Sequence, residues 1–303
     1  DINILDIPLT KLCVEEFSNP KQRLLFKNLG YVGVLASILE MDKSIYETLI
    51  EEQFKGKEKL IEPNVKALGI GYKYAEENFK DMCDIKVIQS NKTDGLILTS
   101  GNDAAGLGCV YGGASVCAWY PITPSTSLAE SFSKYSEKLR IEDDTQKNKF
   151  AFIQAEDELA AVGMTIGANW NGARAFTATS GPGISLMSEF IGLAYFAEVP
   201  SVIFNVQRGG PSTGMPTRTQ QSDILACAYA SHGDTKHVFL IPCDPKECFD
   251  FAADSFDLAD RLQTPIFVLL DLDLGMNDWS TKEFTWDNDR SYDKGKVLSK
   301  EDL

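Results

Sequence analysis

The sequence predicts an α/β fold, in which a parallel sheet carries helices on both faces and follows a mainly helical segment. Two observations support this prediction. Between residues 95 and 277, apolar extended runs alternate with segments of helical period, which is typical of parallel strands covered by helices on both faces. Residues 1–78 instead carry apolar side chains at helical spacing.

The first 78 residues are expected to form helices. Apolar residues recur at helical spacing in three segments: 28–39, 44–54 and 64–74. Ser44 is the predicted N-cap of the second segment, with Glu47 three residues later as its capping-box partner. Residues 79–94 have weak periodicity and several polar breaks, so we expect a linker or a short crossing strand there.

The alternating block contains the predicted sheet. Six extended runs are expected to be strands: 95–99, 150–154, 174–179, 201–206, 237–241 and 265–270. Helical patterns lie between them at 125–138, 157–170, 184–197 and 246–261. Ligands of open parallel sheets bind beyond the carboxyl ends of the strands, so function is expected in the loops that follow the strands. Residues 278–303 are polar and mixed, and we expect a connector there.

Composition excludes several classes of function. There are 29 Lys and Arg residues against 44 Asp and Glu residues, a formal net charge of −15. Nucleic acid and anionic membrane surfaces are therefore not expected as partners. No apolar run reaches the roughly 20 residues of a membrane span, and no signal-peptide pattern opens the chain.

The cysteines and histidines also narrow the chemistry. The 7 cysteines include no C-x-x-C pair, so we expect free thiols in a reducing cytoplasm and no metal or iron–sulfur site built by this chain alone. Neither histidine follows a G-x-S-x-G elbow or suggests a Cys–His pair, which disfavours a hydrolase triad. A G-x-G-x-x-G nicotinamide fingerprint is absent as well.

The loop at residues 118–127 is the first of four that suggest chemistry. Pro121 and Pro124 hold the backbone in an extended shape. Thr123 is the predicted N-cap of the helix that follows, with Pro124 at the first helical position. The N–H groups at the helix start suit an anion such as a carboxylate. A well-capped helix without any ligand remains the alternative.

Three acids begin the second motif, Glu156, Asp157 and Glu158, ahead of a helix of small and apolar residues. The helix dipole accounts for acids in a first turn, which covers Glu156 and Asp157. Glu158 lies at the edge of close packing, where partial desolvation would favour its neutral form and indicate a functional site. Glu156 is its nearest rival for such a role.

The third motif is the turn T-S-G-P-G at residues 179–183. Its two glycines would let the backbone at Ser180 and Gly181 approach a ligand closely. No Lys follows, so the turn is not a phosphate loop of the Walker type. A tight turn between a strand and a helix, without a ligand, remains possible.

The fourth motif is a long polar loop at residues 205–217. Arg208 stands where the preceding strand ends, and its guanidinium fork can bind a carboxylate with two hydrogen bonds. A surface ion pair is the alternative in so acidic a chain. The length of the loop and its Ser and Thr content favour a ligand.

In this order, the four motifs resemble those of 2-oxoacid:ferredoxin oxidoreductase alpha subunits. The resemblance covers about residues 95–290 and rests on Y-P-I-T-P-S at 120–125, on Glu158, on T-S-G-P-G, and on Q-R-G-G-P-S-T-G-M-P-T at 207–217. Residues 1–78 resemble the C-terminal part of a gamma domain of that family. A gamma domain fused ahead of an alpha domain looks most like the 2-oxoglutarate type.

The resemblance implies that residues 95–277 form the pyrimidine-binding half of a thiamine diphosphate site. Glu158 would be the catalytic acid that hydrogen-bonds the aminopyrimidine nitrogen. Pro121 and Ile122 would lie beside the cofactor ring, and the turn with Ser180 and Gly181 would also bind the cofactor.

It also implies a substrate and partners. Thr123 and Arg208 would hold the carboxylates of the substrate, with Thr217 as a weaker candidate. The reaction would be oxidative decarboxylation of 2-oxoglutarate with coenzyme A to succinyl-CoA, with electrons passed to ferredoxin. Pyruvate, branched-chain 2-oxoacids, a non-catalytic assembly subunit and a small-molecule binding module remain alternatives.

The G-D-G magnesium–diphosphate motif and the iron–sulfur cysteines of the family are absent from this chain. The family carries both on its beta subunit, which would share the thiamine diphosphate and hold the Mg²⁺ and the [4Fe-4S] clusters. We therefore expect activity only with that subunit. Residues 278–303 would connect to a second transketolase-like domain that is missing from this sequence.

Overall fold

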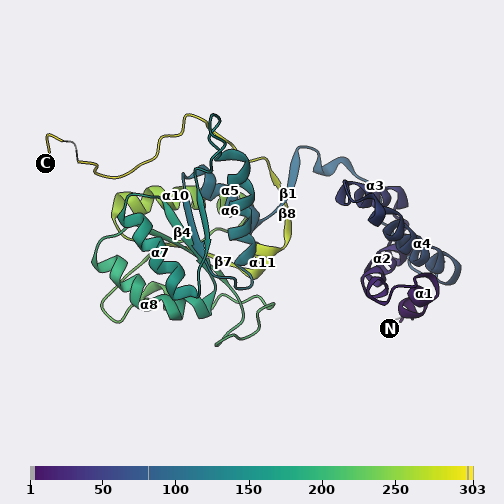
Figure 1. The fold of residues 1–303 in the computed structure, drawn as a ribbon. Helices are drawn as coiled ribbons and strands as arrows, with labels where there is room; N and C mark the ends of the chain where they lie inside the picture. Colours follow the sequence, from purple (N-terminus) through teal and green to yellow (C-terminus); the bar gives the residue numbers. More distant parts are fainter. Residues whose placement is uncertain (1–3, 81, 299, 303) are drawn as a thin grey trace. The chain divides into compact units, whose positions relative to one another are not determined.

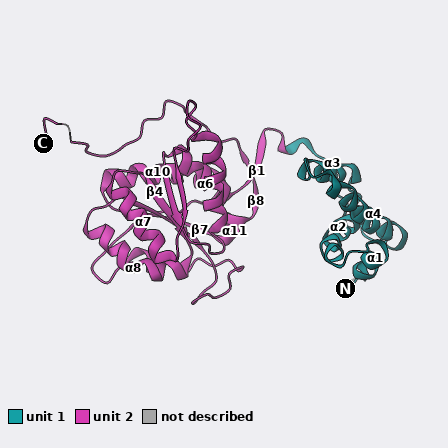
Figure 2. Ribbon diagram, viewed as in Figure 1, with its two compact units in different colours: residues 1–92 teal, residues 93–303 magenta. Residues whose placement is uncertain are grey.

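The computed structural model describes residues 4–80, 82–298 and 300–302. The chain separates into two compact units, residues 1–92 and 93–303, each with a hydrophobic core of its own (Figure 2). The boundary lies within the segment that the sequence predicts to be a linker.

The first unit is helical, as predicted (Figure 1). Its α-helices are α1 (Leu9–Glu16), α2 (Pro20–Ile38), α3 (Lys43–Gln53) and α4 (Ile61–Asn78). The three predicted helical segments lie within α2, α3 and α4 or extend one residue past an end of them. Helix α1 lies in the stretch expected to be helical, but no separate segment was predicted for it. The prediction of Ser44 as an N-cap is wrong: the cap is Asp42, whose carboxylate accepts a 2.9 Å hydrogen bond from the Ser44 backbone N–H.

Glycines bring α2 and α4 into backbone contact. A Cβ atom at Gly71 would lie 1.8 Å from the carbonyl oxygen of Gly30, and one at Gly33 would lie 2.0 Å from that of Leu68. Both distances are far below a van der Waals contact, so only hydrogen fits at these two positions. Next to this crossing, the rings of Phe17 and Phe26 pack with their centroids 4.5 Å apart.

The second unit contains the predicted parallel sheet. The strand order is β3-β2-β4-β5-β7-β6, and every neighbouring pair is parallel. The strands are β2 (Val116–Trp119), β3 (Ala151–Gln154), β4 (Ala175–Thr179), β5 (Ser201–Gln207), β6 (Val238–Leu240) and β7 (Pro265–Asp271). The predictions for β3 to β7 are confirmed, but β2 was not predicted.

The predicted strand at residues 95–99 does form, but not in the parallel sheet. It is β1 (Leu96–Ser100), which pairs antiparallel with β8 (Asp278–Lys282) in a separate two-stranded sheet. Its predicted place in the parallel sheet is therefore wrong. A strand covered by helices on both faces would bury its apolar side chains, whereas Leu98 is 68% exposed. The partner β8 lies in the segment predicted to be a connector.

Helices cover both faces of the parallel sheet, as predicted (Figure 1). One face packs against α5 (Gly101–Tyr111), α6 (Thr126–Leu139) and α10 (Pro245–Leu262), and the other against α7 (Glu158–Trp170) and α8 (Gly181–Phe196). Two short helices, α9 (Ile224–Ala228) and α11 (Leu272–Met276), follow β5 and β7. Successive side chains of β5 pack into the two cores alternately: Ile203 packs on the α8 side and Phe204 on the α10 side.

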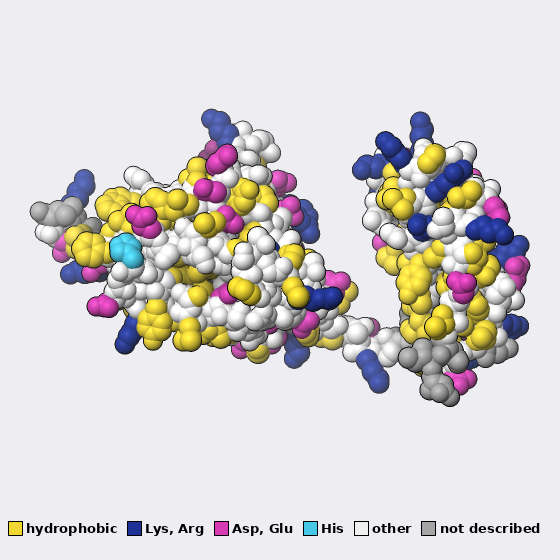
Figure 3. Space-filling model, turned by 90° about the horizontal axis from the view of Figure 1, so that it is seen from below, with side chains coloured by type: hydrophobic (Ala, Val, Ile, Leu, Met, Phe, Trp, Pro, Cys, Tyr) yellow, Lys and Arg dark blue, Asp and Glu magenta, His cyan; other side chains and the backbone are white. Residues whose placement is uncertain are grey.

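Apolar side chains also reach the surface of each unit, among charged ones (Figure 3). On α2, Leu24 and Leu25 are each 66% exposed, and on α8 the exposed fraction of Phe196 is 88%. Leu186 and Leu193 of α8 are exposed as well. The outer side of α8 is therefore largely apolar.

Candidate active site

The strand order creates a crevice between β2 and β4. Because β2 lies between β3 and β4, the chain leaves β2 toward one edge of the sheet and returns to β4 on the other side. The helices that follow these two strands, α6 and α8, therefore lie on opposite faces. Ligands of open α/β sheets bind at such a switch point. The loops at residues 120–125 and 180–183, both predicted from sequence, flank it.

Glu158 is the first residue of α7 and is buried, with 6% of its surface exposed. The preceding Asp157 caps the helix by accepting a 2.7 Å hydrogen bond from the backbone N–H of Ala160. The Glu158 carboxylate has no hydrogen-bond or ion-pair partner among the residues that the structure describes. Its predicted burial is confirmed, and its rival Glu156 is exposed.

The turn after β4 lies against Glu158. A Cβ atom at Gly183 would be 2.9 Å from Cγ of Glu158 and 1.9 Å from Oγ1 of Thr179. Ser180 is at the N-cap of α8, yet its hydroxyl makes no capping bond and is buried without a partner. An unpaired acid and an unpaired hydroxyl thus lie on adjoining segments. They fit a ligand that both accepts and donates hydrogen bonds, as an aminopyrimidine ring does.

The loop after β2 differs from its prediction in one respect. Helix α6 begins at Thr126 with Ser125 as its N-cap, so the prediction of Thr123 as the cap is wrong. The backbone N–H groups of Ser125 and Thr126 both donate to the carbonyl oxygen of Ile122, at 2.9 and 3.2 Å. These N–H groups are satisfied within the loop, so they do not form the anion site that was expected there. Pro121 and Thr123 are exposed.

Arg208 is buried at the end of β5 and reaches the loop after β2. Its Nη1 atom donates a 2.6 Å hydrogen bond to the carbonyl oxygen of Thr123, and its Nη2 atom donates a 2.9 Å bond to that of Thr213. The alternative of a surface ion pair is therefore wrong, since Arg208 is 7% exposed and its partners are carbonyl groups. The structure brings together two residues that the sequence assigned to substrate.

Thr217 is less well placed. Its side chain is exposed, and no hydrogen bond within the described ranges joins it to Arg208 or Thr123. The backbone around it is held by neighbours, because Gly209 donates to the carbonyl oxygen of Arg218 at 2.7 Å. Its assignment to the substrate stays a prediction.

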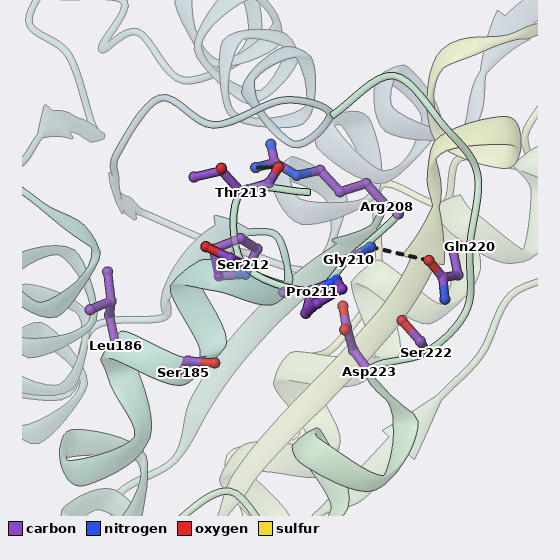
Figure 4. A pocket seen from close by; sticks show the side chains of 13 residues that line it. Ser185, Leu186, Arg208, Gly210, Pro211, Ser212, Thr213, Gln220, Ser222 and Asp223 are labelled. Carbon is purple, nitrogen blue, oxygen red and sulfur yellow. Dashed lines mark hydrogen bonds between the residues drawn. The ribbon is translucent and has the colours of Figure 1, made fainter. Parts of the chain in front are cut away.

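A cavity of about 650 Å³ opens beside Arg208 (Figure 4). Its walls are the first turns of α8 and the loop between β5 and α9: Gly181, Pro182, Ser185, Leu186, Arg208, Gly209, Gly210, Pro211, Ser212, Thr213, Gln220, Ser222 and Asp223. Sequence reasoning missed Gln220 and Asp223. Their place in the loop after β5 was the only available signal.

The polar groups of this wall are tied to one another. Gln220 accepts a 3.1 Å hydrogen bond from the backbone of Gly210, and Asp223 accepts one of 3.2 Å from the side chain of Asn205. Behind Asn205, burial raises the pKa of the Cys227 thiol to about 12. Cys227 therefore remains protonated at neutral pH, which argues against a role as a nucleophile.

The rest of the second unit and the first unit offer little further chemistry. Among the described residues, no group of three or more His, Cys, Asp or Glu side chains could hold a metal ion. Within the same ranges, no helix has both the length and the apolar character that crossing a bilayer requires. The 7 cysteines are free thiols, as predicted, and Cys243 is exposed.

Residues 107–292 match the family model described as pyruvate flavodoxin/ferredoxin oxidoreductase, thiamine diphosphate-binding. Residues 1–74 match a second model, pyruvate ferredoxin/flavodoxin oxidoreductase. The chain belongs to this oxidoreductase family. The family prediction made from the four motifs is confirmed, and so is the relationship to the 2-oxoglutarate type.

Relatives within the oxidoreductase family carry related names. The 2-oxoacid:ferredoxin oxidoreductase 1 subunit alpha of Aeropyrum pernix is 37% identical over 246 residues, which is 81% of this chain and 38% of that protein. The 2-oxoglutarate synthase subunit KorA of Methanothermobacter thermautotrophicus is 45% identical over 171 residues, 56% of this chain and 43% of that one. The chain thus spans about two-fifths of the length of these relatives.

A solved member of the family has the same fold. It is a 2-oxoglutarate:ferredoxin oxidoreductase from Magnetococcus marinus with 2-oxoglutarate, coenzyme A and succinyl-CoA bound. The match has a TM-score of 0.78 at 30% identity and covers 97% of this chain and 49% of that one.

Proposed function

We propose that this chain supplies the pyrimidine-binding half of a thiamine diphosphate site in a 2-oxoglutarate:ferredoxin oxidoreductase. In the overall reaction, 2-oxoglutarate loses CO₂ and its carbonyl carbon is oxidised to the thioester of succinyl-CoA. The two electrons released pass to ferredoxin, and the thiol proton of coenzyme A is released.

The observation that carries the proposal is the environment of Glu158. The Glu158 side chain is 6% exposed, its carboxylate has no partner among the described residues, and its Cγ lies against Gly183 at the switch point of the sheet. An acid with so little exposed surface and no protein partner loses part of its hydration, and a ligand that supplies a hydrogen-bond partner would offset this cost. A ring nitrogen that shares a proton with the acid would be such a partner.

Thiamine diphosphate, when bound, supplies the electron sink for cleaving the bond to the carboxylate carbon. The residues of this chain would bind and orient. Glu158 would hold a proton at its carboxyl oxygen, facing the pyrimidine ring. Ser180 and Gly181 would lie along the ring, and Pro121 and Ile122 would exclude water from one side of it. Mg²⁺, the diphosphate and the [4Fe-4S] clusters would be held by a beta subunit.

The substrate would enter beside Arg208. Its carboxylate would take the place of one of the carbonyl groups that Arg208 now binds, since an arginine fork binds a carboxylate more strongly than a neutral carbonyl. The hydroxyl of Thr123 would donate a second hydrogen bond, and Thr217 is a weaker candidate for a third. These roles require the loops after β2 and β5 to stay close to each other, which the hydrogen bond between Arg208 and Thr123 supports.

The partner would cover the outer side of α8, where Leu186, Leu193 and Phe196 are exposed. Exposed apolar faces of this kind are typical of subunit interfaces. Free, buried thiols support a reducing compartment, and we place the enzyme in the cytoplasm.

A broader substrate range is the second candidate function. Relatives named 2-oxoacid:ferredoxin oxidoreductase support a site that accepts pyruvate or branched-chain 2-oxoacids as well, because Arg208 would bind any carboxylate. A screen of 2-oxoglutarate, pyruvate and 2-oxoisovalerate distinguishes the two candidates.

The test uses the complex purified with its beta subunit, assayed with coenzyme A and a viologen dye. The Glu158→Gln variant keeps the volume of the side chain and loses its acid. We expect its turnover to fall by roughly 100-fold or more, as for the loss of a general acid, while the exposed Glu156→Gln control stays within about twofold. Equal rates for Glu158→Gln and the wild type would disprove the proposal.

A further inference from the structure

Asn102 lies in the first turn of α5, outside the four loops that form the candidate site. Its side chain is completely buried. The amide Nδ2 atom donates a 2.8 Å hydrogen bond to the carbonyl oxygen of Pro124 and a 2.9 Å bond to Oγ of Ser127. Helix α5 thereby holds the loop after β2 through one side chain.

The two acceptors of Nδ2 set the orientation of this amide. Its Oδ1 atom has no partner, and a Cβ atom at Gly275 of α11 would lie only 2.8 Å from it. Rotating the amide by half a turn would place Oδ1 against the Pro124 carbonyl oxygen, and two acceptors repel each other. Asn102 therefore acts at this loop as a donor.

Two successive carbonyl groups of the loop are thus bound from different directions. Arg208, from the end of β5, binds that of Thr123, and Asn102, from α5, binds that of Pro124. Between these two bonds, the main chain at Thr123 has little freedom. The side chain of Thr123 leaves the backbone at this point.

We propose that Asn102 is a positioning residue, which fixes the loop after β2 so that Thr123 can bind the carboxylate of the 2-oxoacid. The inference rests on the proposed function. Asn102 itself does not touch the substrate. Without the Asn102 amide, the loop shifts and the Thr123 hydroxyl moves away from the carboxylate. Binding of the 2-oxoacid therefore weakens more than the chemical step slows.

The experiment compares Asn102→Ala and Asn102→Asp with the wild type in the assembled enzyme. Aspartate keeps the size and loses the donors. For both variants we expect the KM for the 2-oxoacid to rise at least tenfold, kcat to fall less than threefold and the KM for coenzyme A to stay within twofold. A purely structural role would lower the amount of active enzyme and leave each KM unchanged.

The matched control is Asn169→Ala. Asn169 is also buried, and its amide exchanges two hydrogen bonds with the backbone of Ala175, near the amino end of β4. This variant should lose thermal stability and keep each KM within twofold. If the Asn102 variants do not assemble, Gly275→Ala replaces them, because its Cβ displaces the Asn102 amide and should raise the same KM.

The outcomes separate the two claims. An active wild type with an unchanged 2-oxoacid KM in the Asn102 variants, or in Gly275→Ala where they do not assemble, overturns the positioning role alone. A wild-type complex with no 2-oxoacid-dependent dye reduction overturns the proposed function, and the positioning role with it.

Discussion

The guanidinium of Arg208 donates a 2.6 Å hydrogen bond to the carbonyl oxygen of Thr123, 85 residues earlier in the chain. This bond joins the loop after β2 to the loop after β5. A charged donor makes it stronger than a bond between neutral groups. The second bond, to Thr213, holds the glycine-rich segment that forms one wall of the cavity.

Replacing Arg208 by lysine should therefore uncouple the two loops. A lysine keeps the charge, but its single ammonium group cannot reproduce the planar fork. We expect kcat/KM for the 2-oxoacid to fall by about 10- to 100-fold, the effect of losing one charged hydrogen bond. Steady-state kinetics of the assembled enzyme measure this. The control is Arg261→Lys, in an exposed pair with Asp293, which should stay within about twofold; an equal loss in both variants would contradict the prediction.

Gly183→Ala should lower both stability and activity through a steric clash. The new Cβ would collide with Oγ1 of Thr179 and press on Cγ of Glu158, and overpacking of this kind costs about 1–3 kcal/mol. Urea unfolding of the full chain should show this loss, with reduced activity in the complex. At Gly167, also helical, nothing lies within 4 Å of a Cβ, so Gly167→Ala should stabilise by roughly 0.5–1 kcal/mol. If both variants are equally stable, the close packing around Glu158 is refuted.

Arg174→Met should be among the most destabilising substitutions in the second unit. Arg174 is 6% exposed and forms ion pairs of 2.7 Å with Asp257 and 2.9 Å with Asp260. Its Nη1 and Nη2 atoms also donate to the carbonyl oxygens of Gly112 and Asp293, both at 2.8 Å. Asp257 keeps its 2.8 Å ion pair with Arg290, but Asp260 loses its partner, and breaking a buried pair in this way costs about 3–5 kcal/mol.

Denaturant unfolding of the full chain measures this change. Lys246→Met is its control, because the ion pair of Lys246 with Asp250 is exposed and such pairs contribute less than about 1 kcal/mol. A loss for Arg174→Met as small as that for Lys246→Met would show that the buried pairs contribute little.

His237 should make stability depend on pH. Burial lowers the pKa of His237 below its usual 6.5, against a smaller opposite effect of the Ala230 carbonyl. The unfolded chain then binds more protons than the folded one, so this contribution is complete above pH 6.5 and is lost as the pH falls toward the lowered pKa. The slope from one such group is at most about 1.4 kcal/mol per pH unit.

The measurement is urea unfolding between pH 7.5 and pH 5.5. In His237→Phe, a ring remains between Tyr195 and Phe267, which contact His237 at centroid distances of 5.3 and 5.2 Å. We expect this variant to lose less stability than the wild type as the pH falls, and the exposed His232→Gln to behave as the wild type. Parallel curves for wild type and His237→Phe would rule out the titration.

Much of the sheet could be predicted from sequence because its central strands are long and continuously apolar. Strand β2 was missed because small residues, Cys117 and Ala118, occupy its centre, and alanine disfavours strands; the equally short β3 has Phe152 and Ile153 there. Helix α5 was missed because its glycines disfavour helix. One of them, Gly108, is required by packing, since a Cβ there would lie 2.3 Å from the carbonyl oxygen of Phe249. The pairing of β1 with β8 joins distant segments, which local patterns do not reveal.

Those parts of the site could be predicted whose environment is set by neighbours in the sequence. The burial of Glu158 follows from the small residues beside it in the sequence. The contact of Arg208 with Thr123 was not predictable, because a backbone carbonyl has no signature in the sequence and only folding brings it near the arginine. Asn102 was missed for the same reason, since one of its two acceptors is the carbonyl oxygen of Pro124.

The close approach of α2 and α4 at Gly33 and Gly71 leaves almost no freedom to substitute these two residues. A Cβ atom at Gly33 or at Gly71 would meet a main-chain carbonyl oxygen, that of Leu68 or of Gly30, so no change of rotamer could make space for even one methyl group. Any larger residue would push α2 and α4 apart at this point and loosen the packing of the neighbouring cluster around Phe26. Substitutions at these two sites should therefore be tolerated only with a wholesale rearrangement of the helical unit.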